Sequence, residues 1–337
     1  MSLSDSTLIT QFTSGNSQAF SILVDRYQKR VYGFIFSKVK DAELADDVFQ
    51  DTFVKVIKNN KMTINLNGSL FDFKVPKIMG ILNVTPDSFY DGGKFNSDKK
   101  IIIQVEKMLK DGADIIDVGG YSSKPGSNKI SSKTEIERVI PTIKLLKETF
   151  KEIVISVDTF RSDVAKKAIS NGASIINDIS SGELDKNMFK CVAELGVPYI
   201  MMHMQGTPQT MQKKPYYKNV ITDITKNLSK KIHLARKQGV LDIIVDPGFG
   251  FGKTIDHNYE ILKNLEHLKE LECPILIGVS RKSMIYKLLN NSANESLNGT
   301  TCLNTISILK GASILRVHDV KEAKEVIQLT TFLKNTL

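Results

Sequence analysis

The sequence predicts an α/β protein: a (β/α)8 TIM barrel preceded by a β-hairpin and a small all-helical N-terminal arm. Two observations predict the barrel. Eight short apolar segments alternate with helical patterns in residues 62–337, and this alternation is typical of a parallel sheet covered by helices. No Gly-x-Gly-x-x-Gly motif follows the first segment, which disfavours an open dinucleotide-binding sheet. A chain of 337 residues is long enough for such a barrel and a small additional unit.

Residues 1–61 are predicted to be helical. One apolar stripe with helical spacing consists of Phe20, Leu23, Val24, Tyr27, Val31 and Phe34, and a less regular one of Leu44, Ala45, Val48, Phe53 and Ile57. Turn signals at Ser14-Gly15-Asn16 and Lys40-Asp41 separate the helices. Because so short a unit buries little apolar surface, we expect its stability in isolation to be low.

The pattern changes at Met62. Short apolar runs flank Asn67-Gly68, and an Asn-Gly pair in this context is the strongest local signal for a β-hairpin. We therefore predict two domains, a helical arm at residues 1–61 and a barrel at residues 62–337, joined near residues 61–62.

The predicted barrel strands are short apolar runs: Ile78–Val84, Ile115–Gly119, Val154–Asp158, Ser174–Asp178, Tyr199–His203, Ile243–Asp246, Ile275–Val279 and Ser313–Val317. The predicted helices between them include Asp98–Leu109 behind a capping Ser97, Lys133–Phe150, Ser162–Ile169, Thr225–Lys237 and Asn258–Lys269. The carboxyl ends of the strands in such a barrel form one face, which carries the active site. The arm enters before the first strand, so we expect it to lie away from the chemistry.

Polar residues begin where almost every predicted strand ends. They are Asn83, the segment Asp117–Gly126, Asp158-Thr159, Asn177-Asp178, His203–Gln205, Asp246–Lys253, Ser280–Ser283 and Arg316–Asp319. A single Asp or His in such a place is more often a structural cap or an ion-pair partner. Recurrence at eight equivalent strand ends favours one shared binding site at the barrel mouth.

The residue types fall into two groups. Two carboxylates, an amide and an ammonium suit the edge of a flat heterocycle with amino, N–H and carbonyl groups, and they belong to Asp158, Asn177, Asp246 and Lys282. Arg316, His318 and Arg281 follow the last two strands, where barrels commonly bind phosphate. The ligand suggested is a heterocycle that bears a phosphate group.

Composition excludes several other classes. No apolar run is long enough for a membrane span, and the N-terminus has no signal-peptide pattern. Cys191, Cys273 and Cys302 are too widely spaced for a zinc site and odd in number for a disulfide framework, so we expect a cytoplasmic protein. The net charge of +9 contains no compact basic block, so we expect no direct contact with nucleic acid and no membrane binding.

Residues 62–337 resemble the dihydropteroate synthase family. The matching segments occur in the order MGILNVTPDSF, DVGGYSSKPG, ISVDTF, INDIS, MHMQGTPQTMQ, DPGFGFGK, GVSRKS and LRVHDV. The resemblance implies a transferase of folate biosynthesis that condenses 6-hydroxymethyl-7,8-dihydropterin diphosphate with 4-aminobenzoate, releases diphosphate and is a target of sulfonamides. It also implies an Mg²⁺ cofactor and a homodimer.

The resemblance also implies roles for individual residues. The pterin would be held by Asp158, Asn177, Asp246 and Lys282. Diphosphate would contact Asn83, Ser123, Arg316 and His318, with Asn83 also reaching the Mg²⁺. Aminobenzoate would bind among Ser123, Lys124, Pro125, Phe251 and Ser283. Catalysis would depend on Asp158, Lys282 and Asp91, the last by closing the first loop over the site.

The expected chemistry begins with early loss of diphosphate and continues with attack of the amine on a pterin carbocation, which the Asp158 and Asp246 carboxylates favour. Two departures from the family pattern affect this expectation. Ser122-Ser123-Lys124 stands where Ser-Thr-Arg is more frequent. A hydroxyl is kept, but a guanidinium that can form two parallel hydrogen bonds is replaced by the single charge of an ammonium group. Tyr121 stands where Glu is frequent.

The arm resembles the second conserved region of extracytoplasmic-function sigma factors, from Leu8 to Asn60. In that family the helix matching Asp41–Lys58 docks on RNA polymerase, and the promoter-reading segments that follow are not found in this sequence. We expect no working transcription role. Two alternatives stay open: a pterin-dependent methyltransferase that passes a methyl group to a corrinoid, and a regulator whose arm contacts polymerase while the barrel senses pterin.

Overall fold

The computed structural model describes residues 3–13, 16–49, 52, 63–85, 94–122 and 129–336. Contacts divide the chain into two compact units, Met1–Asp72 and Phe73–Leu337. By this division the hairpin belongs with the helical arm. The predicted boundary at residues 61–62 lies outside the described residues and stays a prediction.

The first unit contains α1 (Asp5–Thr13), α2 (Ser17–Val39) and a helical segment at residues 42–49. Asn16 caps α2 by accepting a hydrogen bond from the amide of Gln18, and α2 ends at Lys40 with a φ of 53°. Both places carried predicted turn signals. The core of this unit is small, with Leu8, Ala19 and Leu23 at its centre.

The predicted apolar stripe of α2 is buried only in part. Leu23 is buried, but Phe34 is 67% exposed and the neighbouring Ile35 is buried in its place. The hairpin follows the prediction closely. Strands β1 (Thr63–Leu66) and β2 (Ser69–Asp72) pair antiparallel around Asn67 and Gly68, which both have positive φ angles, 52° and 85°, as a type I′ turn requires.

The second unit is a barrel of eight parallel strands in the order β8-β7-β6-β5-β4-β3-β10-β9. The strands are β3 (Lys77–Asn83), β4 (Ile115–Gly119), β5 (Ile155–Asp158), β6 (Ile175–Asp178), β7 (Tyr199–Met202), β8 (Ile243–Asp246), β9 (Leu276–Ile277) and β10 (Ile314–Val317). A parallel bridge between Val245 and Ile275 closes the ring. The predicted (β/α)8 fold is confirmed, with seven strands within one residue of their predicted bounds.

The predicted strand Ile275–Val279 is longer than the observed β9. Only Leu276 and Ile277 form ladder pairs with β10, opposite Ile314 and Leu315. Gly278 follows directly, and a Cβ built on it would lie 3.8 Å from the Cβ of Arg316. The apolar run therefore continues past the paired residues.

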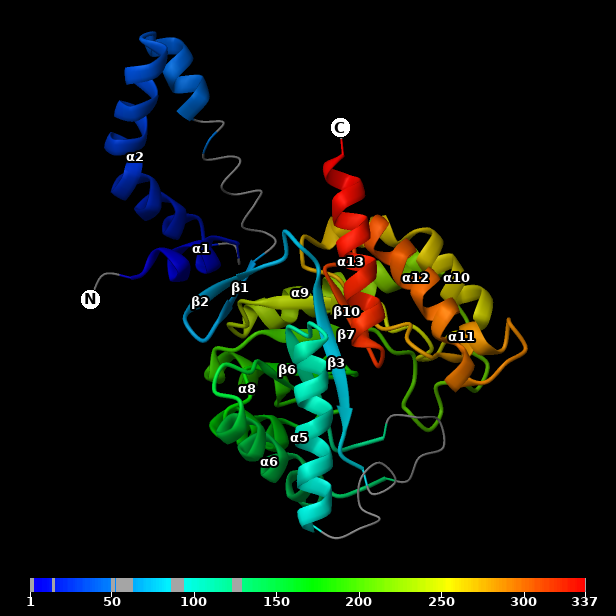
Figure 1. The fold of residues 1–337 in the computed structure, drawn as a ribbon. Helices are drawn as coiled ribbons and strands as arrows, with labels where there is room; N and C mark the ends of the chain where they lie inside the picture. The colour runs from blue at the N-terminus through cyan, green and yellow to red at the C-terminus, as the bar shows by residue number, and fades with distance from the viewer. Residues whose placement is uncertain are drawn as a thin grey trace. The chain divides into compact units, whose positions relative to one another are not determined.

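Helices cover the outside of the barrel (Figure 1). They are α5 (Lys94–Lys110), α6 (Ser132–Thr149), α7 (Ser162–Ser170), α8 (Met188–Leu195), α9 (Val220–Lys237), α10 (Ile255–Lys263), the 3-10 helix η1 (Leu265–Leu271), α11 (Ser283–Tyr286), the 3-10 helix η2 (Ala293–Glu295), α12 (Leu297–Leu309) and α13 (Val320–Asn335). Among the described residues, no helix combines the length and the apolar character that a membrane crossing requires.

Three helix predictions need correction. Helix α5 begins at Lys94, so Ser97 lies inside it and does not precede it. Helix α9 begins five residues earlier than predicted, because Asn219 accepts a hydrogen bond from the amide of Thr222 and so caps it. The predicted helix Asn258–Lys269 divides at Asn264, whose side chain donates to the carbonyl of Glu260 at 2.9 Å.

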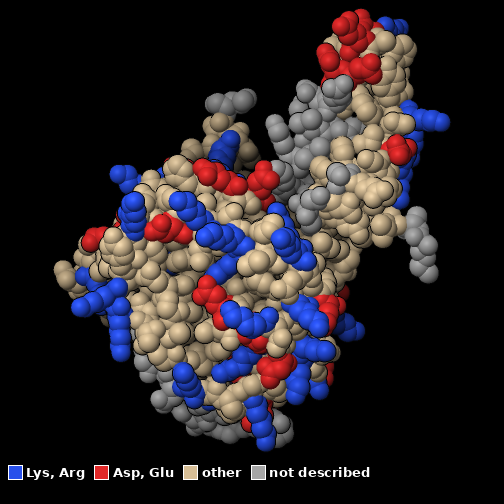
Figure 2. Space-filling view, turned by 180° about the vertical axis from the view of Figure 1, so that it is seen from behind, with Lys and Arg blue, Asp and Glu red and all other residues tan. Residues whose placement is uncertain are grey.

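Lys and Arg are dispersed among Asp and Glu over the face of the barrel drawn in Figure 2. This distribution is typical of a solvated surface.

Candidate active site

The strand register places three predicted site residues in one row. Asn83 pairs with Gly119, Gly119 with Asp158, and Asp158 with Asn177. Residues paired across parallel strands point to the same side of a sheet, and successive residues alternate sides. The neighbouring row, which includes Leu82 and Val157, packs in the core together with residues of the outer helices. The first row therefore faces the barrel interior at the carboxyl ends of the strands.

Arg316 lies on β10, which pairs with β3 on the side away from β4, and its side chain reaches this row. Its Nε donates to Asp117 Oδ2 at 2.7 Å and its Nη2 donates to Asp158 Oδ2 at 2.8 Å. Asp117 Oδ2 also accepts a hydrogen bond from Asn177 Nδ2 at 3.1 Å. Four side chains from β4, β5, β6 and β10 thus form one network, which shows that residues far apart in the sequence meet at a single barrel mouth.

Three ionisable groups at the barrel mouth, one of them in this network, have pKa values shifted from their ordinary values. Burial raises the pKa of Asp158 to about 7, and the nearby Asp117 carboxylate adds to this rise while Arg316 opposes it. Burial also raises the pKa of Asp246, against the attraction of Lys282. The pKa of Lys282 falls to about 8, mainly through burial, although Asp246 opposes the change. Small changes in this environment therefore alter the charge of the site.

Lys282 lies against the glycine-rich loop that follows β8. Its Nζ donates to the carbonyl of Phe249 at 2.5 Å and lies 4.9 Å from the centre of the Phe251 ring. Gly250 has a φ of 84°, and a Cβ built on it would lie 3.5 Å from Lys282 Cδ. The positive φ, which glycine adopts without strain, is therefore what requires glycine at this turn of the loop beside the lysine.

His318 is held by Ser280. Its Nδ1 lies 3.0 Å from Ser280 Oγ, and its backbone amide donates to the same oxygen at 3.2 Å. Partial burial lowers the pKa of His318 to about 4, with the charges of Arg316 and Arg281 acting in the same direction. The imidazole is therefore neutral at pH 7.

Arg281, which the sequence places with Arg316 and His318 as a phosphate contact, forms a bidentate ion pair with Asp319, from Nε at 3.0 Å and from Nη2 at 2.5 Å. Two of its five N–H groups are used in this pair, so its phosphate contact stays a prediction. The ion pair links the loop after β9 to Asp319, the residue before α13.

Phe251 is half-buried against an apolar wall at the mouth, formed by Ile179, Met202, Met204, Met211, Phe160 and Phe251 itself. Ser283 is the first residue of α11, directly after Lys282. The remaining predicted site residues, Asp91, Ser123, Lys124 and Pro125, lie outside the described residues, so their placement stays a prediction.

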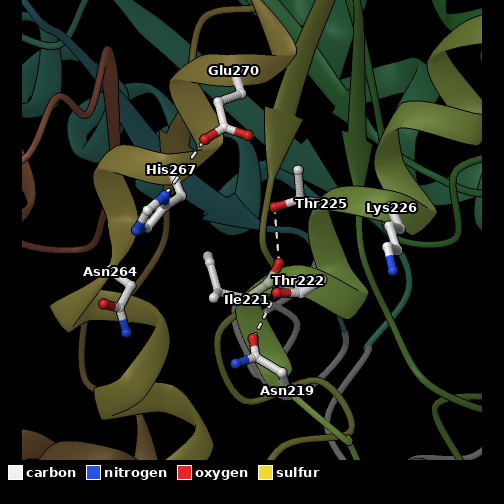
Figure 3. A pocket seen from close by; sticks show the side chains of 8 residues that line it. All are labelled: Asn219, Ile221, Thr222, Thr225, Lys226, Asn264, His267 and Glu270. Carbon is white, nitrogen blue, oxygen red and sulfur yellow. Dashed lines mark hydrogen bonds and ion pairs between the residues drawn. The ribbon is translucent and has the colours of Figure 1, made fainter.

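A hollow of 510 Å³ on the outer helices is a separate feature (Figure 3). It is lined by Asn219, Ile221, Thr222, Thr225, Lys226, Asn264, His267 and Glu270. His267 pairs with Glu270 at 3.5 Å and Asn219 caps α9. These side chains come from α9, η1 and their flanks and not from strand ends, so this hollow is distinct from the barrel mouth.

Comparison with known proteins identifies the family. Residues 79–318 match the family model "Pterin binding enzyme". The dihydropteroate synthase of Haemophilus influenzae is 41% identical over 270 residues, which cover 80% of this chain and 98% of that protein. The corresponding enzyme of Escherichia coli K12 is 42% identical over 270 residues, 80% of this chain and 95% of that protein. The chain belongs to the dihydropteroate synthase family.

Solved structures of dihydropteroate synthases share the fold. A Yersinia pestis synthase in a sulfonamide drug complex has a TM-score of 0.77 and 39% identity, covering 82% of this chain and 100% of that one. A Xanthomonas albilineans synthase with 4-aminobenzoic acid has a TM-score of 0.76 and 32% identity, covering 82% and 99%. Separately, residues 23–61 match the model for sigma-70 region 2, which confirms the resemblance of the arm.

Three residues of this synthase barrel belong to the predicted polar strand ends, but the sequence predicts no individual role for them. Asp117 is fully buried within β4, and a charged residue inside an apolar strand needs partners, a signal that could have identified its role. Lys253 is buried and donates to the carbonyls of Gly248 and Phe251 at 2.8 and 2.9 Å. His203 lies 3.1 Å from Lys253, and its pKa falls to about 2 through burial and that neighbouring charge, so it stays neutral.

Asn83 fits the metal role that the synthase resemblance implies. It is the exposed last residue of β3, and a Cβ built on Gly119 would lie 3.4 Å from its Oδ1 and 3.6 Å from Asp158 Cβ. The glycine therefore leaves the amide oxygen uncovered. No group of three His, Cys, Asp or Glu among the described residues could bind a metal ion. Mg²⁺ takes oxygen ligands and commonly combines few protein oxygens with substrate phosphates and water, so the Asn83 amide oxygen could serve as its protein ligand.

Proposed function

We propose that this chain condenses 6-hydroxymethyl-7,8-dihydropterin diphosphate with 4-aminobenzoate to form dihydropteroate and diphosphate. The single observation that carries the proposal is the network in which Arg316 bridges Asp117 and Asp158 while Asp117 accepts from Asn177. It joins groups suited to the pterin and to the diphosphate at one mouth, in a member of the synthase family.

The pterin would bind among Asp158, Asn177, Asp246 and Lys282. The carboxylates accept from the amino and ring N–H groups, while the Asn177 amide and the Lys282 ammonium donate to ring nitrogens and the carbonyl. Asn177 and Asp246 are buried, so these hydrogen bonds form away from bulk water. A buried polar group left unpaired is costly, and this favours ligands with the matching pattern of donors and acceptors.

The diphosphate would contact Arg316 and His318. Arg316 uses two of its five N–H groups on carboxylates, so three remain for phosphate oxygens. In the tautomer in which His318 Nδ1 accepts from the Ser280 hydroxyl, Nε2 carries the proton and can donate as well. Asn83 would hold Mg²⁺, which when bound neutralises charge on the diphosphate, and the predicted contact of Ser123 adds a hydroxyl donor.

The reaction exchanges one bond for another. The C–O bond between the pterin methylene and the diphosphate breaks, and its electron pair leaves with the diphosphate, which Arg316 and His318 stabilise. The Asp158 and Asp246 carboxylates favour the cation left on the pterin. The aromatic amine then forms the C–N bond and its ammonium proton passes to solvent, so no enzyme nucleophile is required. Lys282 orients the pterin, and Asp91 is predicted to close the first loop.

The amine would lie against Phe251 and Ser283, with Ser123, Lys124 and Pro125 predicted to complete its pocket. Phe251 offers a half-buried aromatic face next to the Lys282 ammonium, which suits a flat anilinic ring. Sulfonamides would occupy the same place, since they carry a similar aromatic amine; the Yersinia pestis synthase has been solved in a sulfonamide drug complex. The affinity for them depends on Lys124, which replaces the more frequent Arg.

The test is a turnover assay on the full chain. Purified protein is given the pterin diphosphate, 4-aminobenzoate and Mg²⁺, and both diphosphate and dihydropteroate are measured. We expect the two products in equal amounts. Absence of diphosphate release, together with methyl transfer from a methylated pterin to a corrinoid, would instead establish the methyltransferase alternative.

We further propose a cytoplasmic homodimer that pairs through helices at the end of the barrel. Apolar side chains on α12 and α13 are exposed, namely Leu309, Leu329, Phe332 and Leu333. Cys191, Cys273 and Cys302 are free thiols, as expected in a reducing compartment. Light scattering on the purified protein measures the mass, and a monomer at micromolar concentration would contradict the dimer.

A further inference from the structure

Tyr121 is the residue for which the family pattern offers no role, because Glu is frequent at its position. It follows β4 by two residues and is 8% exposed. Its hydroxyl accepts a hydrogen bond from Gln209 Nε2 at 3.1 Å. Its ring packs edge-on against Phe160, with ring centres 5.2 Å apart, and the guanidinium of Arg161 lies 5.4 Å from its centre. In this chain the Gln209 amide therefore donates to the neutral hydroxyl of Tyr121, where a Glu would offer a carboxylate.

Gln209 belongs to the segment between β7 and α9, residues 203–219. Two of its glutamines, Gln209 and Gln212, bond to residues outside the segment, and a third, Gln205, bonds within it. Gln205 donates to the carbonyl of Tyr216 at 2.9 Å and accepts from its amide at 3.1 Å. Gln212 donates to the carbonyl of Gly250, and Gln209 donates to Tyr121. The segment is therefore fixed both to the residues after β4 and to the loop after β8, on two sides of the site.

One side of this segment is open to solvent. A surface hollow of 390 Å³ is lined by Gln205, Gly206, Thr210, Met211, Lys213, Lys214 and Tyr216, most of them exposed. Because packing does not hold the segment on this side, its hydrogen bonds to Tyr121 and Gly250 contribute to its position. Met204 and Met211 nevertheless belong to the apolar wall that includes Phe251, so a shift of the segment moves the wall.

We propose that Tyr121 and Gln209 are positioning residues that set the apolar wall for the aromatic amine. The hydrogen bond is linked to the wall because its donor, Gln209, lies two residues before Met211 in the same segment. The Tyr121 ring reaches it through Phe160, which contacts both. This proposal rests on the proposed function, which assigns the amine to Phe251. It goes beyond that function because Tyr121 and Gln209 contact neither substrate.

The test uses Tyr121→Phe, which removes only the hydroxyl and keeps the ring against Phe160 and Arg161. We expect the KM for 4-aminobenzoate to rise by about 3- to 10-fold, the range of one lost neutral hydrogen bond. The kcat and the KM for the pterin diphosphate should stay within about twofold. Gln209→Ala should have the same effect, and the double variant should add nothing further.

Tyr216→Phe is the matched control. It removes a hydroxyl from the same segment, on a side chain that is 76% exposed, and should leave both KM values unchanged. Independent effects of the two single variants, or an equal rise in both KM values, would overturn the pairing of Tyr121 with Gln209 as an amine-positioning device.

Amide hydrogen exchange separates this inference from the proposed function. Without any substrate, residues 205–217 should exchange faster in Tyr121→Phe and in Gln209→Ala than in the wild type or in Tyr216→Phe. Unchanged exchange in both variants would overturn the inference even in an active enzyme. A wild type that lacks synthase turnover would overturn the proposed function while the exchange experiment still tests the anchor.

Discussion

Asp117→Asn is the most informative perturbation of the site. One oxygen of Asp117 accepts from both Arg316 Nε and Asn177 Nδ2, so the substitution removes a charge while keeping the shape of the side chain. A hydrogen bond to a charged group contributes about 1.5–3 kcal/mol. Since about 1.4 kcal/mol corresponds to a factor of ten, we expect kcat/KM for the pterin diphosphate to fall by roughly 10- to 150-fold.

The same substitution has a second expected signature. The Asp117 charge contributes to the raised pKa of Asp158, so its loss should lower that pKa and move the acid limb of the pH–rate profile to lower pH. The assay is steady-state kinetics between about pH 5 and pH 9, a range that includes the pKa values of Asp158, about 7, and Lys282, about 8. Glu270→Gln, at the outer hollow, is the control for an acid-to-amide exchange. A variant within twofold of wild type with an unmoved acid limb would refute the reasoning.

Four further predictions concern the site and the arm. The wild-type profile of kcat/KM should be a narrow bell, because catalysis needs Asp158 ionised and Lys282 protonated while their pKa values are about 7 and about 8; Asp158→Asn should remove the acid limb, and a flat wild-type profile from pH 6 to pH 9 would be incompatible with these roles. Folding stability should fall as pH rises from about 4 to about 7 on account of Asp158, since a raised carboxyl pKa makes the native state bind the extra proton; chemical denaturation of wild type and Asp158→Asn measures the difference, which should vanish if the pKa is unperturbed. Lys282→Ala and Asp246→Ala should each lower turnover by at least about tenfold, and near-normal rates in both would show that the pterin lies elsewhere. Deletion of residues 1–61 should leave kcat unchanged, whereas capture of RNA polymerase by the full chain, lost on this deletion, would favour the regulator.

Local sequence signals predicted much of the barrel. Ile243–Asp246 matches the observed strand because an apolar run that ends in a polar residue marks both the strand and its carboxyl end. Ile115–Gly119 also matches, with Asp117 inside the run and a glycine at its end. The seventh strand was overestimated, because an apolar run does not reveal which residues find a ladder partner. The early start of α9 depends on the Asn219 cap, which a periodicity argument does not weigh.

The candidate site was predictable by residue type but not by pairing. Strand ends indicated Asp158, Asn177 and Arg316, and the structure brings them together. The partner of each arginine depends on three-dimensional register: Arg316 reaches Asp117 199 residues earlier, while Arg281 pairs with Asp319. No sequence pattern distinguishes these two guanidinium groups.

The closure of the barrel at one bridge has a consequence for ligand binding. The seam between β8 and β9 rests on Val245 and Ile275, while Asp246 ends one side of it and Lys282 follows the other. A bicyclic ring that contacts both residues would connect β8 to the loop after β9 and so stabilise this seam. Occupancy by the pterin alone should therefore slow amide exchange along this seam and raise the melting temperature, as ligand linkage requires.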